Sequence, residues 1–385
     1  MSSVPELRCE DFFEAFTAIH GHPPYAWQQR LLDEVLTAGV WPSAIAAPTG
    51  AGKTAVLDVA LFHLALSAAS RPRPAPMRIV LAVDRRIIVD QAHARACRIR
   101  EALAGAKEGT ALARMAAGLS VLAGGGSKTL HVAELRGGIP LESDWARRPD
   151  QPTILCTTVD QLGSRLLFRG YGVSPGMAPI HAGLLGADAL LILDEAHLSR
   201  AFEETLAAIG RHRGAEQTIG LPWYWTALTA TPRVETDRVF RLSADERSEP
   251  AIARRLSAQK PVTLVQVDEP LEAKHFKDEA LTLAHKLVSC GEPAPAVAIV
   301  VNRVALARAV FDLLEQDEGA DAVLLTGRVR PVARDSLLKC WQDRLEGRGN
   351  AGNRPLYVVA TQCIEAGADF DFDAMVSQIA PLDAL

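Results

Sequence analysis

The stretch of sequence that decides the fold is Ala47-Pro48-Thr49-Gly50-Ala51-Gly52-Lys53-Thr54. It fits the phosphate-loop pattern, with alanine in place of the leading glycine. The apolar run at residues 43–47 predicts a buried strand that leads into the loop, and residues 54–67 predict a helix that leaves it. Because the pattern requires a strand before the loop and a helix after it, we predict a parallel α/β domain around this stretch.

Each part of this loop has a task in nucleotide binding. The glycines allow backbone N–H groups to turn inward around phosphates, and the helix N-terminus adds a favourable dipole. Lys53 is expected to contact the β and γ phosphates, and the Thr54 hydroxyl is expected to bind Mg²⁺. The alternative is a loop that matches the pattern by chance. The predicted ATP-binding residues of the loop are Thr49, Gly50, Ala51, Gly52, Lys53 and Thr54.

A second buried run, residues 190–193, leads directly into Asp194-Glu195-Ala196-His197. An acidic pair at a strand end places one carboxylate near Mg²⁺ and the next near the attacking water. We expect Asp194 to hold the metal and Glu195 to orient and deprotonate the water, with Lys53 as the third catalytic residue. His197 is needed for neither task. In the alternative interpretation, the acidic pair only caps a helix.

The bulk composition limits the class of protein. The chain has 385 residues with a formal net charge of -5, which excludes a protein coated in positive charge but leaves room for one local strand-binding groove. None of its 6 cysteines forms a C-x-x-C pair, which favours free thiols in a reducing compartment. The N-terminus lacks the apolar core of a signal peptide, and the apolar runs are too short to span a membrane. We therefore expect a cytoplasmic enzyme without a membrane partner.

Apolar runs divide the chain into two α/β blocks on either side of a charged segment at residues 240–260, which we expect to be poor in strands. The predicted domains are residues 1–245 and 246–385. Strands are expected in the first block at residues 43–47, 79–83, 153–157, 190–193 and 225–229, and in the second at 262–267, 296–301, 322–325 and 356–361. Helices are expected at residues 54–67, 87–104, 275–288, 304–315 and 334–344.

The phosphate loop and the acidic box together resemble those of superfamily 2 helicases, and specifically those with a DEAH-type box. The resemblance implies two tandem RecA-like parallel-sheet domains, the second one incomplete in this sequence. It also implies ATP and Mg²⁺ as the cofactors of a nucleic-acid-dependent ATPase.

Further motifs of the nucleotide side fall in the order of that family. Residues 24–28 resemble the glutamine motif, in which Gln28 would contact the adenine edge; the alternative is a glutamine on a helix surface. Thr229-Ala230-Thr231 resembles the motif whose hydroxyls couple the ATP site, through the histidine of the box, to the strand-binding face. The coupling residues are then Thr229, Thr231 and His197, and the alternative for the threonines is a plain turn before Pro232.

Two segments of the first block resemble nucleic-acid motifs of the family. Arg86 follows the predicted strand at residues 79–83 and precedes a helix, where a guanidinium suits a phosphate oxygen. Its alternative is a solvated pair with Arg85. Thr158 stands in a segment that resembles motif Ib and would donate to another phosphate, although a single threonine carries little information.

In the second block, residues 359–369 resemble motif V closely. In the family, the threonine of this motif contacts the nucleic-acid strand, which assigns that role to Thr361. The Gly-x-Asp part faces the nucleotide, which adds Gly367 and Asp369 to the predicted ATP-binding residues.

The flanks of these motifs resemble the helicase subunit of type I CRISPR systems, most like the subtype I-G (formerly I-U) branch. The segments that carry this resemblance are residues 83–91, 135–138, 158–162 and 325–331. Such helicases are recruited by an RNA-guided surveillance complex and reel in the displaced single-stranded DNA 3′→5′ while a linked HD-type nuclease cuts it. The implied partners are therefore single-stranded DNA and a type I surveillance complex, and we expect a monomeric motor.

The sequence departs from this family in two ways. No His-Asp dipeptide occurs in the 385 residues, so we expect the nuclease beyond Leu385 or on another chain. Motif VI, which bears the arginine finger, would follow Leu385, and without it we expect a chain that binds ATP and DNA but hydrolyses poorly. The alternatives left open are a restriction-type translocase, an RNA helicase, and an ATP-dependent scaffold that clamps DNA without moving.

Overall fold

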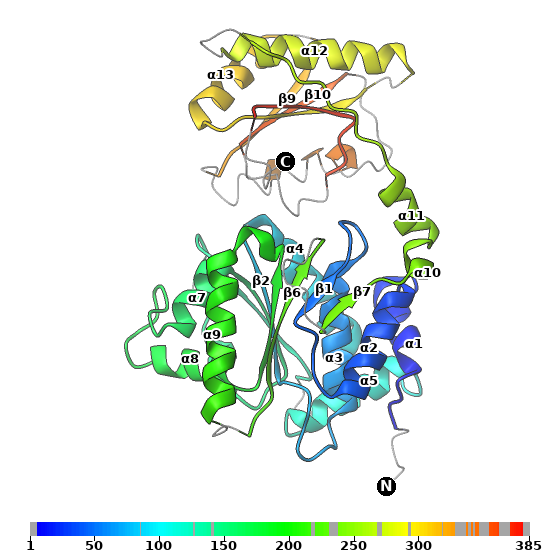
Figure 1. Cartoon of the computed structure of the whole chain (residues 1–385), viewed down its shortest axis with the longest axis vertical. Helices are drawn as coiled ribbons and strands as arrows, with labels where there is room; N and C mark the ends of the chain where they lie inside the picture. The colour runs from blue at the N-terminus through cyan, green and yellow to red at the C-terminus, as the bar shows by residue number, and fades with distance from the viewer. Residues whose placement is uncertain are drawn as a thin grey trace. The chain divides into compact units, whose positions relative to one another are not determined.

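The computed structural model describes most of the chain and divides it into two compact units, Met1–Gln259 and Lys260–Leu385 (Figure 1). The structure describes residues 6–84, 86–125, 128–139, 142–216, 220–230, 238–267, 272–291, 294–317, 319–327, 336–337, 340–341, 343–345, 354–361 and 370–379. Each unit is an α/β domain with a parallel sheet, which confirms the predicted fold class. Among the described helices, none combines the length and the apolar character that crossing a membrane takes.

Unit 1 is built on a sheet of 7 strands in the order β3-β4-β2-β5-β6-β1-β7, and every neighbouring pair is parallel. All carboxyl ends of the strands therefore lie at one edge of the sheet, which is where such folds bind ligands. The strands are β1 (Ala44–Ala46), β2 (Arg78–Val83), β3 (His131–Leu135), β4 (Thr153–Thr158), β5 (Ala189–Asp194), β6 (Trp223–Thr229) and β7 (Val239–Arg241).

Five of these strands were predicted from the sequence, and two were not. β3 carries Glu134 in its interior and lies at the edge of the sheet, so its apolar run is interrupted. β7 has only 3 residues and pairs with β1 at the other edge. It begins the segment 240–260 that was expected to be poor in strands, and that segment otherwise holds two short helices.

Helices cover both faces of the sheet in unit 1. In Figure 1, α7, α8 and α9 lie on one side of the sheet, and α2, α3 and α5 lie on the other. The helices are α1 (Asp11–His20), α2 (Ala26–Ala38), α3 (Val56–Leu66), α4 (Arg86–Ala104), α5 (Ala111–Leu122), α6 (Asp144–Arg147), α7 (Val159–Leu166), α8 (Ala178–Gly186), α9 (Arg200–Glu216), α10 (Ala244–Arg247) and α11 (Pro250–Ser257). Two 3₁₀ turns, η1 (Lys53–Ala55) and η2 (Ala196–Leu198), follow β1 and β5.

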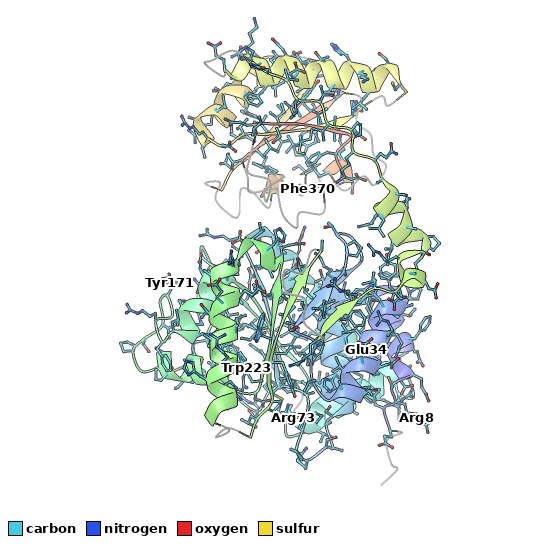
Figure 2. All side chains as sticks on the ribbon, in the orientation of Figure 1. Arg8, Glu34, Arg73, Tyr171, Trp223 and Phe370 are labelled. Carbon is cyan, nitrogen blue, oxygen red and sulfur yellow. The ribbon has the colours of Figure 1, made fainter. Side chains whose placement is uncertain are left out.

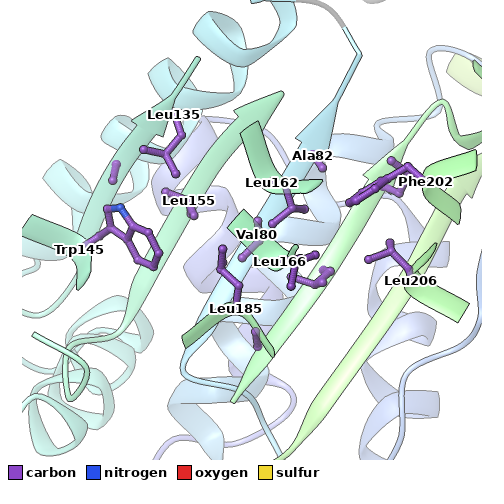
Figure 3. Close-up of a cluster of buried hydrophobic side chains, with 14 of the residues drawn as sticks. Val80, Ala82, Leu135, Trp145, Leu155, Leu162, Leu166, Leu185, Phe202 and Leu206 are labelled. Carbon is purple, nitrogen blue, oxygen red and sulfur yellow. The ribbon is translucent and has the colours of Figure 1, made fainter. Parts of the chain in front are cut away.

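Apolar side chains of alternate strand positions form the core under α6 to α9 (Figure 3). Val80 and Leu155 point from β2 and β4 toward Leu162 and Leu166 of α7, and all four are buried. The strands are buried on both faces, and burial of each large apolar side chain stabilises the fold by roughly 1.5–3 kcal/mol. Figure 2 shows the side chains of this layer, among them Trp223, whose Nε1–H donates to the Leu185 carbonyl oxygen (2.9 Å).

Unit 2 has a sheet of 4 parallel strands in the order β11-β8-β10-β9. Its strands are β8 (Ala296–Val300), β9 (Asp321–Leu325), β10 (Leu356–Ala360) and β11 (Ala374–Ser377). Helices α12 (Ala273–Ser289) and α13 (Val304–Glu315) pack on one face through a core that includes Phe276 and Val310. On β9 and β10, a second core holds Trp341, Leu345, Phe370 and Phe372.

One predicted strand of the second block is wrong. Residues 262–267 have no strand structure, and Val262 and Leu264 are 81% and 84% exposed. Alternating apolar residues favour a strand only when a neighbouring strand accepts their hydrogen bonds, and this segment has no such partner among the described residues. The strand β11 was not predicted, because its burial alternates and its apolar run is short.

Candidate nucleotide and nucleic-acid site

The carboxyl-terminal edge of the unit 1 sheet gathers most of the residues that the sequence singled out. The three strands β5, β6 and β1 lead to most of the predicted nucleotide residues of this unit. On the other side, Arg86 follows β2 and Thr158 ends β4, with β3 at the edge of the sheet beside β4. Because the strand order is continuous, these form two neighbouring halves of one edge. We call them the nucleotide half (β5, β6, β1) and the strand half (β3, β4, β2).

The phosphate loop leaves β1 and turns on two glycines with left-handed backbone conformations. Gly50 has φ 79° and Gly52 has φ 75°, values that glycine adopts without strain. The Ala51 N–H donates to the Pro48 carbonyl oxygen (3.2 Å), and the chain then enters η1 at Lys53. A loop of this shape is the cradle that phosphates require, so the residues present fit a bound nucleotide.

Two side chains of helix α2 donate hydrogen bonds to backbone carbonyl oxygens of the phosphate loop. The Trp27 Nε1–H donates to the Ala51 carbonyl oxygen (3.0 Å), and Trp27 is fully buried. The Gln28 Nε2 amide donates to the Gly52 carbonyl oxygen (3.2 Å), and its Oε1 accepts from the Tyr25 N–H (3.0 Å). Gln28 is 1% exposed, so the alternative of a surface glutamine is wrong. Its predicted contact with adenine stays a prediction.

The side chains of Lys53, Glu195 and His197 lie in a row at the ends of β1 and β5. Lys53 Nζ lies 2.7 Å from Glu195 Oε1, and the lysine side chain is 7% exposed. Glu195 Oε2 lies 3.4 Å from His197 Nδ1. Glu195 has φ 46°, a left-handed conformation that is uncommon for a side chain of this size and marks a constrained position.

Asp194 ends β5 and lies next to this row of side chains. Its Oδ1 accepts a hydrogen bond from the Glu195 N–H (3.0 Å). Burial raises the pKa of Asp194 to about 6, against the opposing effect of the nearby Lys53 ammonium. The alternative of a plain helix cap finds no support at Glu195, because that residue precedes η2 and its side chain makes no capping hydrogen bond.

The threonines of the nucleotide half lie around the loop. Thr49 is exposed, and Thr54 is partly exposed within η1. Thr229 is buried at the end of β6, opposite Ala46 in the strand register, and its carbonyl oxygen accepts from the Ala47 N–H (3.2 Å). The predicted residues Thr231, Gly367 and Asp369 lie outside the described residues.

Mg²⁺ prefers oxygen ligands and is commonly held by one or two protein oxygens together with substrate phosphates. Asp194 provides a carboxylate at the end of β5, and Thr54 provides a hydroxyl in η1, which follows β1; β5 and β1 flank β6 in the sheet. The donor set therefore fits this ion, and the assignment of the two residues as its ligands stays a prediction.

In the strand half, Arg86 begins α4 and is exposed. Its guanidinium packs on Gly137, where a Cβ atom would lie 2.9 Å from Arg86 Nη2. The neighbouring Arg136 contacts Asp90 (Nε to Oδ1, 2.5 Å) and also pairs with Glu134. These ion pairs tie the end of β3 to α4, so the segments 83–91 and 135–138 meet in space.

Thr158 ends β4 and takes the N-cap position of α7, with an extended backbone (φ −81°, ψ 153°). It lies opposite Val83 of β2 in the strand register. Thr361 belongs to unit 2, where it follows β10 and its N–H donates to the Leu325 carbonyl oxygen (3.3 Å). Each predicted nucleic-acid residue thus follows or ends a parallel strand, as the sequence indicated.

The sequence predicted no role for Trp27 or Arg136. Trp27 is hydrogen-bonded to the phosphate loop of the nucleotide half, and Arg136 joins β3 to α4 in the strand half. Both lie in segments that the motifs covered, but a buried hydrogen bond from an indole and an ion pair between a strand and a helix leave no mark in the sequence pattern. A large aromatic side chain next to Gln28 was the one signal that could have drawn attention to Trp27.

Comparison with known families defines the class. Residues 22–234, more than half of the chain, match the family model described as type III restriction enzyme, res subunit. The chain therefore belongs to this family, which is a superfamily 2 helicase family.

Within this class, residues 294–385 match the family model described as CRISPR-associated nuclease/helicase Cas3, C-terminal. Together with the match at residues 22–234, this match supports a superfamily 2 helicase of the Cas3 type, as the resemblance indicated. No curated protein matches the chain.

Solved structures share the fold. The T. fusca Cas3–AMPPNP structure has a TM-score of 0.57 and 21% identity, over 96% of this chain and 44% of that one. The DEAD-box helicase Mss116 bound to ssRNA has a TM-score of 0.59 and 14% identity, over 97% of this chain and 68% of that one. The Mycobacterium smegmatis helicase Lhr bound to ssDNA and AMP-PNP has a TM-score of 0.50 and 19% identity, over 96% and 44%. The chain thus spans less than half the length of the Cas3 structure.

Proposed function

We propose that this chain is the motor part of an ATP-driven translocase that moves along single-stranded DNA. The observation that carries the proposal is the Lys53–Glu195 contact of 2.7 Å, at a glycine-turned phosphate loop and beside a strand half with an exposed arginine. Lysine on the loop and glutamate after a buried strand are two of the groups that nucleotide hydrolysis uses. The solved helicases Lhr, bound to ssDNA, and T. fusca Cas3, bound to AMPPNP, support the proposal by their shared fold.

The roles follow from the positions of the groups. The backbone N–H groups of residues 49–54 and the Lys53 ammonium bind the phosphates of ATP, and Thr54 and Asp194 would hold Mg²⁺. When bound, this ion supplies positive charge that stabilises the developing negative charge on the phosphates. Asp194 must be ionised for this task, and its pKa of about 6 leaves it mostly ionised at neutral pH.

Glu195 acts as the general base toward the attacking water. Its Oε1 lies 2.7 Å from Lys53 Nζ, which holds one end of the carboxylate in place. Its Oε2 faces His197, which holds the carboxylate from the other side at 3.4 Å. The constrained backbone at Glu195 fixes this orientation.

Coupling between the two halves runs through Thr229, Thr231 and His197. Thr229 is hydrogen-bonded through its carbonyl oxygen to the start of the loop, and His197 contacts the general base. Arg86 and Thr158 bind strand phosphates in unit 1, and Thr361 binds one in unit 2. Gln28 contacts adenine, and Gly367 and Asp369 complete the nucleotide site.

The proposed setting is a type I CRISPR system of the subtype I-G branch. There the motor would be recruited by an RNA-guided surveillance complex and would pull the displaced DNA strand in the 3′→5′ direction in the cytoplasm. The Cas3 family model at residues 294–385 supports this setting, together with the flanking segments at residues 83–91 and 135–138. A monomer is sufficient for this action.

A restriction-type translocase is the second candidate, because the family model that covers most of unit 1 is described as the res subunit of type III restriction enzymes. An RNA helicase is the third, since Mss116 was solved with ssRNA. These candidates share the nucleotide chemistry and differ in the nucleic acid that stimulates it.

The test is steady-state ATP turnover without nucleic acid, with single-stranded DNA and with single-stranded RNA, each repeated with Glu195→Gln. We expect DNA to stimulate turnover more than RNA does, and Glu195→Gln to lower it by roughly 10²–10⁴-fold because the general base is lost. Stimulation by RNA alone would support the RNA helicase instead. Tight binding of ATP and DNA without turnover would support a clamp that does not move.

A further inference from the structure

Helices α10 and α11 follow β7 and are attached to α2, the helix that supports the phosphate loop (Figure 1). The attachment begins with Glu246, which accepts from Arg30 Nε (2.7 Å) and Nη2 (2.8 Å). The Arg30 guanidinium also lies over the Phe240 ring, 4.1 Å from its centroid. Arg30 holds the pKa of Glu246 below its usual range, which is the effect of a close, partly buried ion pair.

A second contact fixes the start of α11 at the start of α2. Glu249 Oε1 accepts a hydrogen bond from the Ala26 N–H (3.1 Å), one of the free N–H groups in the first turn of α2. Three residues later, Ile252 is fully buried. Helix α11 therefore has a defined place beside the turn that Trp27 and Gln28 hold.

This placement brings Arg255 onto the phosphate loop. Arg255 lies three residues after Ile252, so the two side chains share one face of α11. A Cβ atom on Gly50 would lie 1.7 Å from Arg255 Nη1 and 2.7 Å from its Cδ and Cζ atoms. The guanidinium thus occupies the space that only a glycine leaves open, above the loop residue with φ 79°.

The Arg255 side chain is exposed, and within the described part of the chain no hydrogen bond or ion pair uses its five N–H donors. Its positive charge lies against the same loop as Lys53. A guanidinium with free donors beside a phosphate cradle suits a phosphate oxygen better than an ammonium does, because its planar fork donates two parallel bonds.

We propose that Arg255 is a nucleotide-binding residue, which contacts a phosphate oxygen of the nucleotide from the side of α11. The inference rests on the proposed function, since it assumes that the loop at residues 47–54 binds ATP. It adds a phosphate ligand that comes from outside the loop and from beyond the last strand of the unit 1 sheet.

The neighbouring Arg254 provides a matched control. It is on the same helix, carries the same charge and is also exposed. Adjacent helical residues point in different directions, so Arg254 does not share the face of Ile252 and Arg255. If only the net charge of the protein mattered, replacing either arginine by alanine would lower the affinity for ATP equally.

The experiment measures binding of adenosine, AMP, ADP and ATP by calorimetry, with Mg²⁺, for the whole chain and four variants: Arg255→Ala, Arg255→Lys, Arg254→Ala and Lys53→Ala. We expect Arg255→Ala to weaken ADP and ATP about tenfold and adenosine not at all, because a charged hydrogen bond to phosphate is lost. Arg255→Lys should restore part of this loss, and Arg254→Ala should bind like the unchanged chain. Thermal unfolding without nucleotide checks that each variant is folded.

Equal ATP affinities of Arg255→Ala and Arg254→Ala would overturn the inference. So would an equal loss for adenosine and ATP, or tighter binding by Arg255→Ala, which would make the arginine a competitor of the nucleotide. If the unchanged chain binds no ATP and Lys53→Ala makes no difference, the proposed function itself fails. If Lys53→Ala abolishes binding and Arg255→Ala does not weaken it, only the role of Arg255 fails.

Discussion

The two halves of the unit 1 edge are built from the same kind of parallel strand, yet their side chains are arranged differently. In the nucleotide half, the key groups are already engaged with one another: Lys53 with Glu195, and the loop carbonyls with Trp27 and Gln28. In the strand half, Arg136 pairs with Asp90 and Glu134, whereas Arg86 packs on Gly137 and stays exposed. The nucleotide half is held together by short contacts between its own side chains, and the strand half exposes the positive charge of Arg86.

This difference suits the two proposed ligands. Hydrolysis of a phosphate bond depends on groups held at fixed distances, since small misplacements cost large factors in rate. A strand that must slide is better held by exposed charges, whose attraction is largely independent of sequence and falls with salt. We therefore expect changes in the nucleotide half to be severe and local, and changes in the strand half to be moderate and dependent on salt.

The largest effect is expected for Lys53→Ala. Removing the ammonium should lower ATP turnover by at least about a hundredfold, because the charge on the phosphates loses a buried partner. Binding of single-stranded DNA without nucleotide should stay within about twofold of the unchanged chain, since Lys53 lies in the other half. Turnover assays and fluorescence anisotropy with labelled DNA measure the two quantities. An equal loss of ATP turnover and of DNA affinity would contradict the idea that the two halves act separately.

Asp194→Asn should stabilise the nucleotide-free protein at neutral pH. The folded-state pKa of Asp194 is raised to about 6, so folding favours its protonated form. The stability from this group is fully present below its unfolded pKa and is lost as pH rises through 6. Asparagine carries no charge and avoids that loss. The free energy of unfolding of the variant should therefore exceed that of the unchanged chain by on the order of 1–3 kcal/mol at about pH 7.5.

The gain should shrink at about pH 4.5, where the aspartate of the unchanged chain is itself mostly protonated. Urea unfolding at the two pH values gives both free energies of unfolding. A variant that is less stable at the higher pH, or a gain that does not depend on pH, would show that the charge of Asp194 is compensated in the folded protein.

Arg86→Ala tests the strand half. We expect affinity for single-stranded DNA to fall about tenfold, and the salt dependence of binding to weaken by the equivalent of about one phosphate contact. ATP affinity without DNA should not change. Arg98→Ala is the matched control, because Arg98 is also exposed on α4 and lies twelve residues further along the helix. Similar losses for both variants would mean that general positive charge, and not the strand half, attracts the DNA.

The smallest effect is expected for Gly137→Ala. A Cβ at this position would come within 2.9 Å of Arg86 Nη2, so the guanidinium has to shift while its charge is kept. Affinity for single-stranded DNA should fall by about twofold to threefold, with an unchanged salt slope. Gly183→Ala is the control, since nothing lies within 4 Å of a Cβ at that position. If Gly137→Ala binds single-stranded DNA as tightly as the unchanged chain, the position of the Arg86 guanidinium on Gly137 does not matter for DNA binding.

The parts of the fold that the sequence predicted are those with strong local patterns. The strands β1, β2, β4, β5 and β6 are mostly apolar runs, and all but β2 end in a small or polar residue; buried parallel strands have that pattern. The loop at residues 47–54 and the acidic pair Asp194–Glu195 were found because their chemistry needs particular residues at particular spacings. The superfamily was predicted correctly for the same reason.

What the sequence did not predict depends on partners that are distant along the chain. β3 contains Glu134, which is tolerated because Arg136 and His93 lie beside it. Residues 262–267 have the pattern of a strand, but a pattern cannot supply the neighbour that a strand needs. Arg255 was passed over because its position is set by Glu249 and Ile252, which were taken to be part of a boundary.

The strand register of β1 has a consequence for the order in which the protein is made. Ala44 pairs with Ala227 of β6 on one side and with Val239 of β7 on the other. The phosphate loop therefore leaves the ribosome early, but both strands that flank its own strand are synthesised nearly two hundred residues later. Such distant pairings form slowly, because the long loop between the partners must be closed first. During translation, β1 therefore has neither neighbouring strand of its sheet to pair with until residues 223–241 have been made.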